Sequence, residues 1–220
     1  MLAGYTLRHP DTTFPVFAFR LHQFVSRGKT VYASLEKGDA SYVTTSGQQY
    51  VPGDRDRVLM PLAFCRNCGQ EYHTVTRVKD AESGDTLFQS REFTDTHPQG
   101  KAQVGFLYPD APGVWPDDSR DRITDLPEDW VETKDGTLQV KRTHRDRLPE
   151  LVHVDGTGKK VKDGVRFFYL RSPFTFCLHC GTTYSGRQKS DYGKLATLAA
   201  GGRSTATTVL SLATLDSLRR

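Results

Sequence analysis

The chain has 220 residues, of which 36% are hydrophobic, 25% charged and 10% aromatic, as in ordinary globular proteins of one large or two small domains. Lys and Arg number 30 against 26 Asp and Glu, so the formal net charge is only +4, which permits a polyanionic partner without requiring one. No apolar run approaches the roughly 18 residues of a membrane-spanning helix, and no signal-peptide pattern opens the chain. Four cysteines are too few for a secreted disulfide scaffold. We therefore expect a cytoplasmic protein with reduced cysteines and no membrane partner.

The first part of the chain changes from a helical pattern to a strand pattern. An amphipathic helix is predicted over 15–27, because Phe17, Leu21 and Phe24 share one helical face and Gly28 is placed to end the helix. From residue 30 onward, β-branched and aromatic residues recur with a period of two between turn-forming glycines. These runs predict strands at Thr30–Leu35, Tyr42–Thr45, Gln49–Val51, Val58–Phe64, Tyr72–Val78 and Leu87–Phe93.

The middle of the chain, from about 108 to 136, is rich in proline, aspartate and glutamate. We interpret it as an irregular acidic insertion that Trp115 and Trp130 attach to the rest of the protein, and a solvated insertion without any function is the favoured interpretation. Strands are predicted again after this insertion, at Leu138–Arg142, Leu151–Val154 and Val165–Leu170.

The last part of the chain is predicted to be helical. A short helix is expected over Tyr192–Ala200, and a second one from Thr205 to Leu218 after a capping Ser204. The second helix has apolar residues that find no obvious partner in this chain. The domain prediction is thus a β-rich module over 1–190 followed by a helical segment over 191–220.

All four cysteines lie in two copies of one motif, F-C-x-x-C-G-x-x-Y. The first copy spans 64–72 and holds Cys65 and Cys68, and the second spans 176–184 and holds Cys177 and Cys180. Two residues between the cysteines let both thiolates of one copy reach the same metal ion at about 2.3 Å, and two such pairs complete a tetrahedron. The glycine that follows each pair permits a backbone conformation closed to other residues, so backbone N–H groups can approach the sulfurs. The motifs therefore predict one structural Zn²⁺ held by four cysteines.

This prediction requires closing a loop of 108 residues between Cys68 and Cys177. The length-dependent entropy cost is about 4 kcal/mol, whereas a structural zinc contributes roughly 10–16 kcal/mol in model peptides. Metal binding therefore outweighs the closure cost, and the zinc would join two regions that are distant in the sequence.

Other roles for the cysteines are less consistent with the motif. A thioredoxin-like redox pair requires its first cysteine at a helix N-terminus, disulfides require an oxidising compartment, and catalytic zinc keeps one coordination position open. His73 and His179 lie close to the motifs in sequence, either as neighbours of the metal or simply as exposed residues. The favoured fold class is α+β: a β-rich zinc-knuckle module with flanking helices and a four-cysteine site.

The sequence contains no catalytic motif that we can identify. A G-x-x-x-x-G-K-[ST] phosphate loop is absent, and so are H-E-x-x-H, G-x-S-x-G and G-x-G-x-x-G. Among the loose clusters of basic residues, those in or beside the motifs and at a predicted helix start are the best candidates for phosphate contacts, and a merely solvated surface is the alternative. These candidate nucleic-acid ligands are Arg66, Arg187, Lys189 and Arg203.

Several segments resemble the region between the two RecA-like lobes of large bacterial superfamily 2 DEAD/DEAH-box DNA helicases, of the phage-defence (DISARM-like) and DNA-repair type. The similar residues are in 19–24 (FRLHQF), 31–35 (VYASL) and 62–72 (LAFCRNCGQEY), while 202–212 (GRSTATTVLSL) resembles the approach to the second lobe.

The resemblance implies an ATP-dependent motor acting on DNA, with its ATP site in lobes that this sequence lacks. Only the four cysteines can be matched to the family, as metal ligands, and no catalytic residue can be. The expectation is therefore a zinc-binding accessory module, a fragment that binds RecA-like lobes of the same protein and DNA, with ATP bound only through the missing lobes. The alternative is a stand-alone zinc-ribbon adaptor for protein or nucleic acid, and a small zinc- or thiol-dependent enzyme is a third hypothesis.

Overall fold

The computed structural model describes residues 30–95, 100–110, 115–185 and 188–198. The helices predicted over 15–27 and 205–218, together with Arg187 and Arg203, lie outside the described residues. The part of the chain that is described contains no α-helix, and hence none with the length and apolarity needed to cross a membrane.

The described chain is β-rich, as predicted. Its strands are β1 (Tyr32–Ala33), β2 (Val43–Thr44), β3 (Tyr50–Val51), β4 (Asp54–Val58), β5 (Met60–Cys65), β6 (Glu71–Lys79), β7 (Thr86–Ser90), β8 (Gln103–Pro109), β9 (Val131–Lys134), β10 (Thr137–Val140), β11 (Glu150–Val154), β12 (Val165–Arg171) and β13 (Leu195–Ala196). Short 3₁₀ helices connect them: η1 (Gly38–Ala40), η2 (Ser119–Asp125), η3 (Glu128–Trp130) and η4 (Arg142–Arg147).

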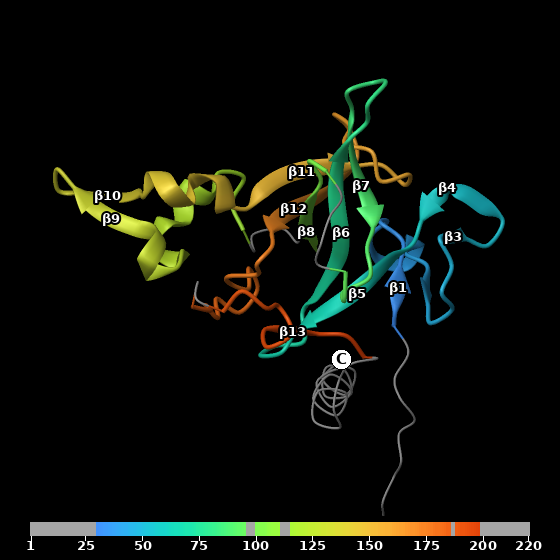
Figure 1. Cartoon of the computed structure of the whole chain (residues 1–220), viewed down its shortest axis with the longest axis horizontal. Coiled ribbons are helices and arrows are strands. Elements are labelled where there is room, and N and C mark those ends of the chain that lie inside the picture. Colours follow the sequence, from blue (N-terminus) through green and yellow to red (C-terminus); the bar gives the residue numbers. More distant parts are fainter. Residues whose placement is uncertain (1–29, 96–99, 111–114, 186–187, 199–220) are drawn as a thin grey trace, which may run out of the picture.

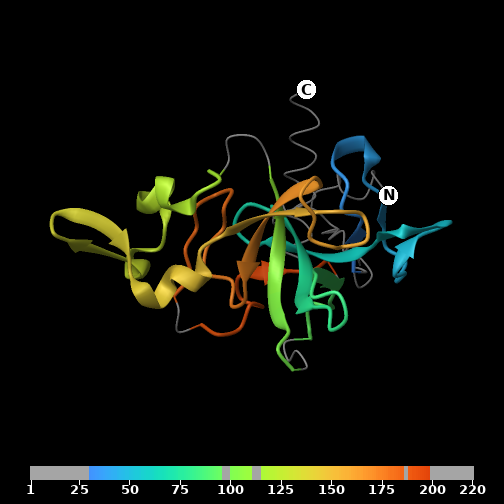
Figure 2. The ribbon, with the colours of Figure 1, turned by 90° about the horizontal axis from the view of Figure 1, so that it is seen from above.

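Nine of these strands form one antiparallel sheet in the order β11-β12-β8-β6-β5-β1-β2, with β7 paired to β6 and β13 paired to β5. The hairpins β3–β4 and β9–β10 stand outside it, and Figures 1 and 2 show β9–β10 projecting from one end of the molecule. Both cysteine motifs adjoin this sheet: the first joins β5 to β6, and the second follows β12.

Side chains from the central strands alternate between two apolar layers, because neighbouring residues of a strand point to opposite faces. On β12, Phe168 and Leu170 belong to the cluster that contains the cysteines, while Phe167 and Tyr169 belong to the other cluster. The cysteine motifs are therefore part of the packing of one sheet face.

The insertion predicted over 108–136 is largely irregular, with η2 and η3 as its only helical turns in the described stretch, but it ends in β9. Trp115 and Trp130 attach it as expected, because their rings lie 5.6 Å and 5.7 Å from the ring of Phe176. Both indoles are buried, with 6% and 2% of their surface exposed.

The prediction of a helix over Tyr192–Ala200 is wrong in the described residues. Leu195 and Ala196 instead form β13, which pairs with Cys65 and Phe64 at the end of β5. Both residues are buried, so the tertiary pairing overrides the local helical preference of this stretch.

Candidate metal centre

The two cysteine motifs have the same backbone structure. In the first, Cys65 N–H donates to Gln70 O and Gly69 N–H donates to Cys65 O. In the second, Cys177 N–H donates to Thr182 O and Gly181 N–H donates to Cys177 O. Phe64 pairs with Glu71 just as Phe176 pairs with Thr183, so the two knuckles are repeats in structure as well as in sequence.

Each knuckle turns on the glycine that follows its second cysteine. Gly69 has φ = 79° and Gly181 has φ = 70°, both in the left-handed region that side chains with a Cβ disfavour. This conformation is the one that the sequence motif predicts. It lets the chain reverse directly after the second cysteine, so that both sulfurs of a knuckle face the same side.

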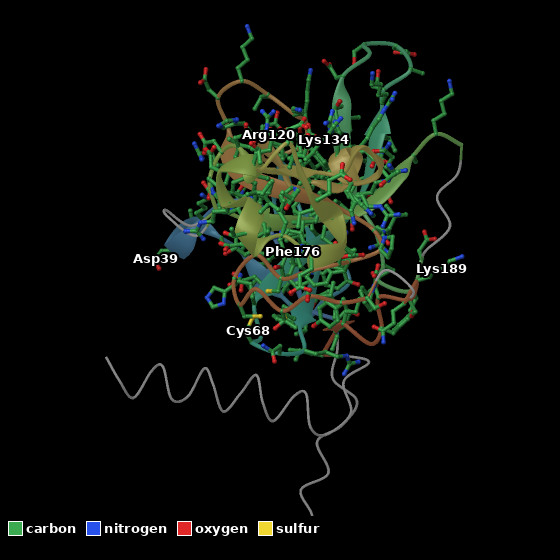
Figure 3. The ribbon with its side chains drawn as sticks, turned by 90° about the vertical axis from the view of Figure 1, so that its left-hand side faces the viewer. Asp39, Cys68, Arg120, Lys134, Phe176 and Lys189 are labelled. Atoms are coloured by element: carbon green, nitrogen blue, oxygen red, sulfur yellow. The ribbon has the colours of Figure 1, made fainter. Side chains whose placement is uncertain are left out.

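The fold brings the four cysteines together. The four Sγ atoms all lie within 4.8 Å of one another. They belong to Cys65, Cys68, Cys177 and Cys180, and the distance from Cys68 Sγ to Cys177 Sγ is 3.8 Å. All four thiols are free of disulfides. A tetrahedral Zn²⁺ with Zn–S distances near 2.3 Å requires S···S separations of about 3.8 Å. The cluster thus has dimensions compatible with a tetrahedral zinc site, and Figure 3 shows yellow sulfur beside the label of Cys68.

The electrostatics of this cluster favour a cation. The sulfurs of Cys177 and Cys65 raise the pKa of the Cys68 thiol, and the contact with Cys65 is the main cause of a pKa of about 12 at Cys177. Without a cation the thiolates cannot all be charged at so short a distance, because like charges disfavour each other's ionisation. A divalent ion at the centre removes that conflict and deprotonates the thiols that bind it.

Polar groups next to the sulfurs are positioned to stabilise negative charge. The buried Tyr72 hydroxyl donates to Cys177 Sγ at 3.2 Å and accepts a hydrogen bond from Leu178 N–H at 3.1 Å. Asn67 Nδ2 donates to Cys180 Sγ at 3.5 Å, and Thr182 Oγ1 lies 3.2 Å from the same sulfur. Such surrounding donors orient ligands and adjust their charge in metal sites.

The tyrosines of the two motifs act across the site rather than within their own knuckles. Tyr72 of the first motif donates to Cys177 Sγ of the second. Tyr184 of the second motif donates to Lys194 O, and Cys65 of the first motif is among the groups that raise its pKa. Burial is the main cause that raises the pKa of both phenols, and the nearby sulfurs raise it further. Both tyrosines are part of the sequence motif, but the motif does not reveal this arrangement across the site.

A buried lysine holds the second knuckle against the first. Lys194 is 1% exposed, and its Nζ donates to Phe174 O and Gln188 O, both at 2.7 Å. Its backbone O accepts from Arg66 N–H at 3.1 Å. The sequence gives no signal for this role, because a lysine just before a short apolar run resembles any surface lysine.

Of the histidines near the motifs, neither is placed as a ligand. His73 points to the opposite sheet face from Tyr72 and packs its ring at 5.6 Å from that of Phe167. His179 is exposed.

The predicted nucleic-acid ligands do not form one group in the described residues. Arg66 Nε donates to Tyr192 O at 2.8 Å, so this arginine holds the segment before β13. Lys189 is exposed and lies well to one side of Cys68 in Figure 3.

Comparison with known proteins gives no relative: no protein-family model, curated protein or solved structure is significantly similar to this chain.

Proposed function

We propose that the chain is a zinc-binding module in which Cys65, Cys68, Cys177 and Cys180 hold one structural Zn²⁺. The observation that carries this proposal is that the four sulfur atoms all lie within 4.8 Å of one another. Four thiolates fill a tetrahedral coordination shell and leave no position for substrate, which favours a structural role over a catalytic one. The ion would bridge two knuckles that lie at opposite ends of a 108-residue stretch.

The zinc proposal is tested by metal analysis of the purified full chain. We expect about one zinc per chain, and a loss of at least tenfold in zinc affinity in Cys68→Ser. His179→Ala is the matched control, because it changes an exposed residue of the same knuckle and should keep the zinc. A chain that binds no zinc, or a Cys68→Ser variant with unchanged affinity, would contradict the proposal.

We further propose that this module is an accessory part of an ATP-dependent superfamily 2 DNA helicase, which braces the motor lobes and presents a surface to DNA. The resemblance of 19–24, 31–35, 62–72 and 202–212 to the inter-lobe region supports this assignment. A rigid four-cysteine unit suits a bracing role, since zinc fixes its geometry without contributing chemistry. ATP would be hydrolysed by the lobes and not by this chain.

DNA contact is tested on the purified chain with fluorescent single-stranded and duplex DNA. We expect binding that weakens steeply with salt, no ATPase activity, and weaker DNA binding in Lys189→Glu with zinc content unchanged. Arg66→Ala helps to separate a DNA-binding role of that arginine from its structural role. Loss of a structural contact alone would lower the stability of the chain without changing the salt dependence of DNA binding. ATP hydrolysis by this chain, or the absence of any DNA binding in the zinc-loaded protein, would argue against the helicase assignment.

A further inference from the structure

Basic residues gather on the 3₁₀ helix η4, which lies between β10 and β11 at the end of the molecule from which the β9–β10 hairpin projects (Figures 1 and 2). The six residues of η4 include Arg142, Arg145 and Arg147. Arg142 and Arg145 are exposed. Because a 3₁₀ helix has three residues per turn, these two side chains start from the same edge of η4. The helix therefore presents concentrated positive charge to solvent.

The helix η4 is anchored to the rest of the protein, so its arginines stand on a fixed support. The ring of His144 is stacked on the buried ring of Trp130, with ring centres 5.5 Å apart and planes 5° apart. Lys141 N–H donates to Trp130 O at 2.8 Å, and Leu148, directly after η4, packs against the cluster that contains the cysteines. A surface that is already ordered loses little conformational entropy when it binds a partner.

Two carboxylates beside this charge are engaged by other arginines. Asp146, within η4, is paired with Arg171 at 2.9 Å. Asp118 lines the same pocket of about 580 Å³ as Arg145, but it is paired with Arg120. The three arginines of η4 form no ion pair with any described residue. Their positive charge is therefore not compensated within the described part of the chain.

The segments outside the described residues contain too few acids to neutralise η4. Their sequence has eight Lys and Arg, with four in 1–29, one at 187 and three in 199–220, and only two acidic side chains, Asp11 and Asp216. Like charges three residues apart in a helix repel each other, so three arginines in one short helix are unfavourable without an anion. The composition therefore indicates that the anion comes from outside this chain.

The chemistry around η4 favours the phosphates of a nucleic acid over an acidic protein. A guanidinium group matches a phosphate with two parallel hydrogen bonds. A protein partner requires an apolar centre in its interface, whereas Leu138, which is 37% exposed, is the only large hydrophobic side chain exposed among residues 115–149. The same residues include no exposed aromatic ring on which bases could stack. The surface thus suits the backbone of a nucleic acid rather than its bases.

We propose that η4 is the surface through which this module contacts DNA, with Arg142, Arg145 and Arg147 bound to backbone phosphates. This inference rests on the DNA contact proposed above and gives that contact a location. The contact depends on salt and not on base sequence, because every nucleotide carries the same phosphate. It is separate from the four cysteines, which keep their structural role.

The location is tested by fluorescence anisotropy of the full chain with single-stranded and duplex DNA of two unrelated sequences, over a range of salt concentrations. Arg142→Ala/Arg145→Ala should weaken binding at least about tenfold for both sequences and lower the salt slope of duplex binding by about 2, because two phosphate contacts are lost. Arg55→Ala/Lys162→Ala is the matched control. It removes the same charge from two exposed residues outside this end of the molecule and should change binding less than about twofold.

The outcomes separate this location from the proposed DNA contact itself. If the wild-type chain binds DNA and the η4 variant binds it equally well, η4 is not the surface, while DNA binding stands. Equal losses in the η4 variant and the control would show an effect of net charge alone and would also overturn the location. If the wild-type chain binds no DNA, or if poly-glutamate of matched charge displaces DNA as well as DNA does, the proposal falls. Zinc content and urea unfolding are measured for each variant, so that a folding defect is recognised.

Discussion

Replacing Tyr72 by Phe tests whether the cysteine cluster operates as a metal site that depends on groups from both knuckles. The Tyr72 hydroxyl is fully buried and bridges Cys177 Sγ at 3.2 Å and Leu178 N–H at 3.1 Å. The substitution leaves a buried N–H without an acceptor, at a cost of about 1–3 kcal/mol. It also removes a donor from a thiolate of the proposed zinc site, a change that typically lowers metal affinity by about 10–100-fold.

We expect Tyr72→Phe to bind zinc about 10–100-fold more weakly in competition with a chromophoric chelator. When zinc is present, it should lose about 2–6 kcal/mol of unfolding free energy: about 1–3 kcal/mol from the unpaired N–H and about 1.4–2.8 kcal/mol from the weaker zinc binding. Tyr184→Phe is the matched control. Its hydroxyl donates to Lys194 O at 3.3 Å, but no backbone N–H among the described residues donates to it, so its effect on stability should be smaller. If Tyr72→Phe retained both zinc affinity and stability, the hydroxyl would have no role in the site.

Two further substitutions test buried polar groups. Burial lowers the pKa of His73 to about 4, with the backbone of Ser34 and Leu107 offsetting part of the effect. An unfolded imidazole titrates near 6.5, so the unfolded state binds more protons between these values and stability falls as the pH drops from about 6.5 to about 4, by about 3 kcal/mol. His73→Phe should flatten this part of the stability curve in denaturant titrations, and a curve of unchanged slope would contradict the assignment. Lys194→Met leaves the carbonyls of Phe174 and Gln188 without their donor and should cost about 3 kcal/mol or more, measured by urea unfolding with zinc bound; a cost below about 1 kcal/mol would show that these contacts are dispensable.

Much of the site could be predicted because its determinants are local. The C-x-x-C-G spacing fixes the turn, and the positive φ angles of Gly69 and Gly181 follow from the residue type alone. Convergence of the two knuckles was inferred only from the chemistry of four cysteines. The cross-site contact of Tyr72 with Cys177 and the role of Lys194 depend on tertiary packing, which no local pattern encodes.

The strands with clear alternation were located, with boundaries shifted by a few residues: Tyr72–Val78 corresponds to β6 and Val165–Leu170 to β12. The central strand β8 was missed. Its sequence, QVGFLYP, is a continuous apolar run containing glycine and proline, and such runs do not show the alternation of a half-exposed strand. Gly105 is required there, because a Cβ would lie 2.6 Å from Leu170 O. A glycine inside a strand can mark such a close approach of the neighbouring backbone.

The position of β8 also changes what the proposed zinc ion would have to do. The long loop between Cys68 and Cys177 is not closed by metal alone, since β6 pairs with β8 over five residue pairs and β8 with β12 over five more. The sheet therefore offsets most of the closure entropy that the sequence assigns to zinc. Removing the ion should consequently loosen the knuckles without unfolding the sheet, in contrast to small zinc fingers, which unfold without metal.

Hydrogen exchange of the full chain with and without a chelator tests this expectation. Amides of 65–70, 177–185 and 191–196 should lose protection, because their hydrogen bonds hold the knuckles and β13 together. Amides of β6, β8 and β12 should stay protected, since they open only with the cooperative core. Loss of protection in both groups at the same rate would mean that the metal supports the whole fold, and that sheet pairing alone cannot hold the two knuckles side by side.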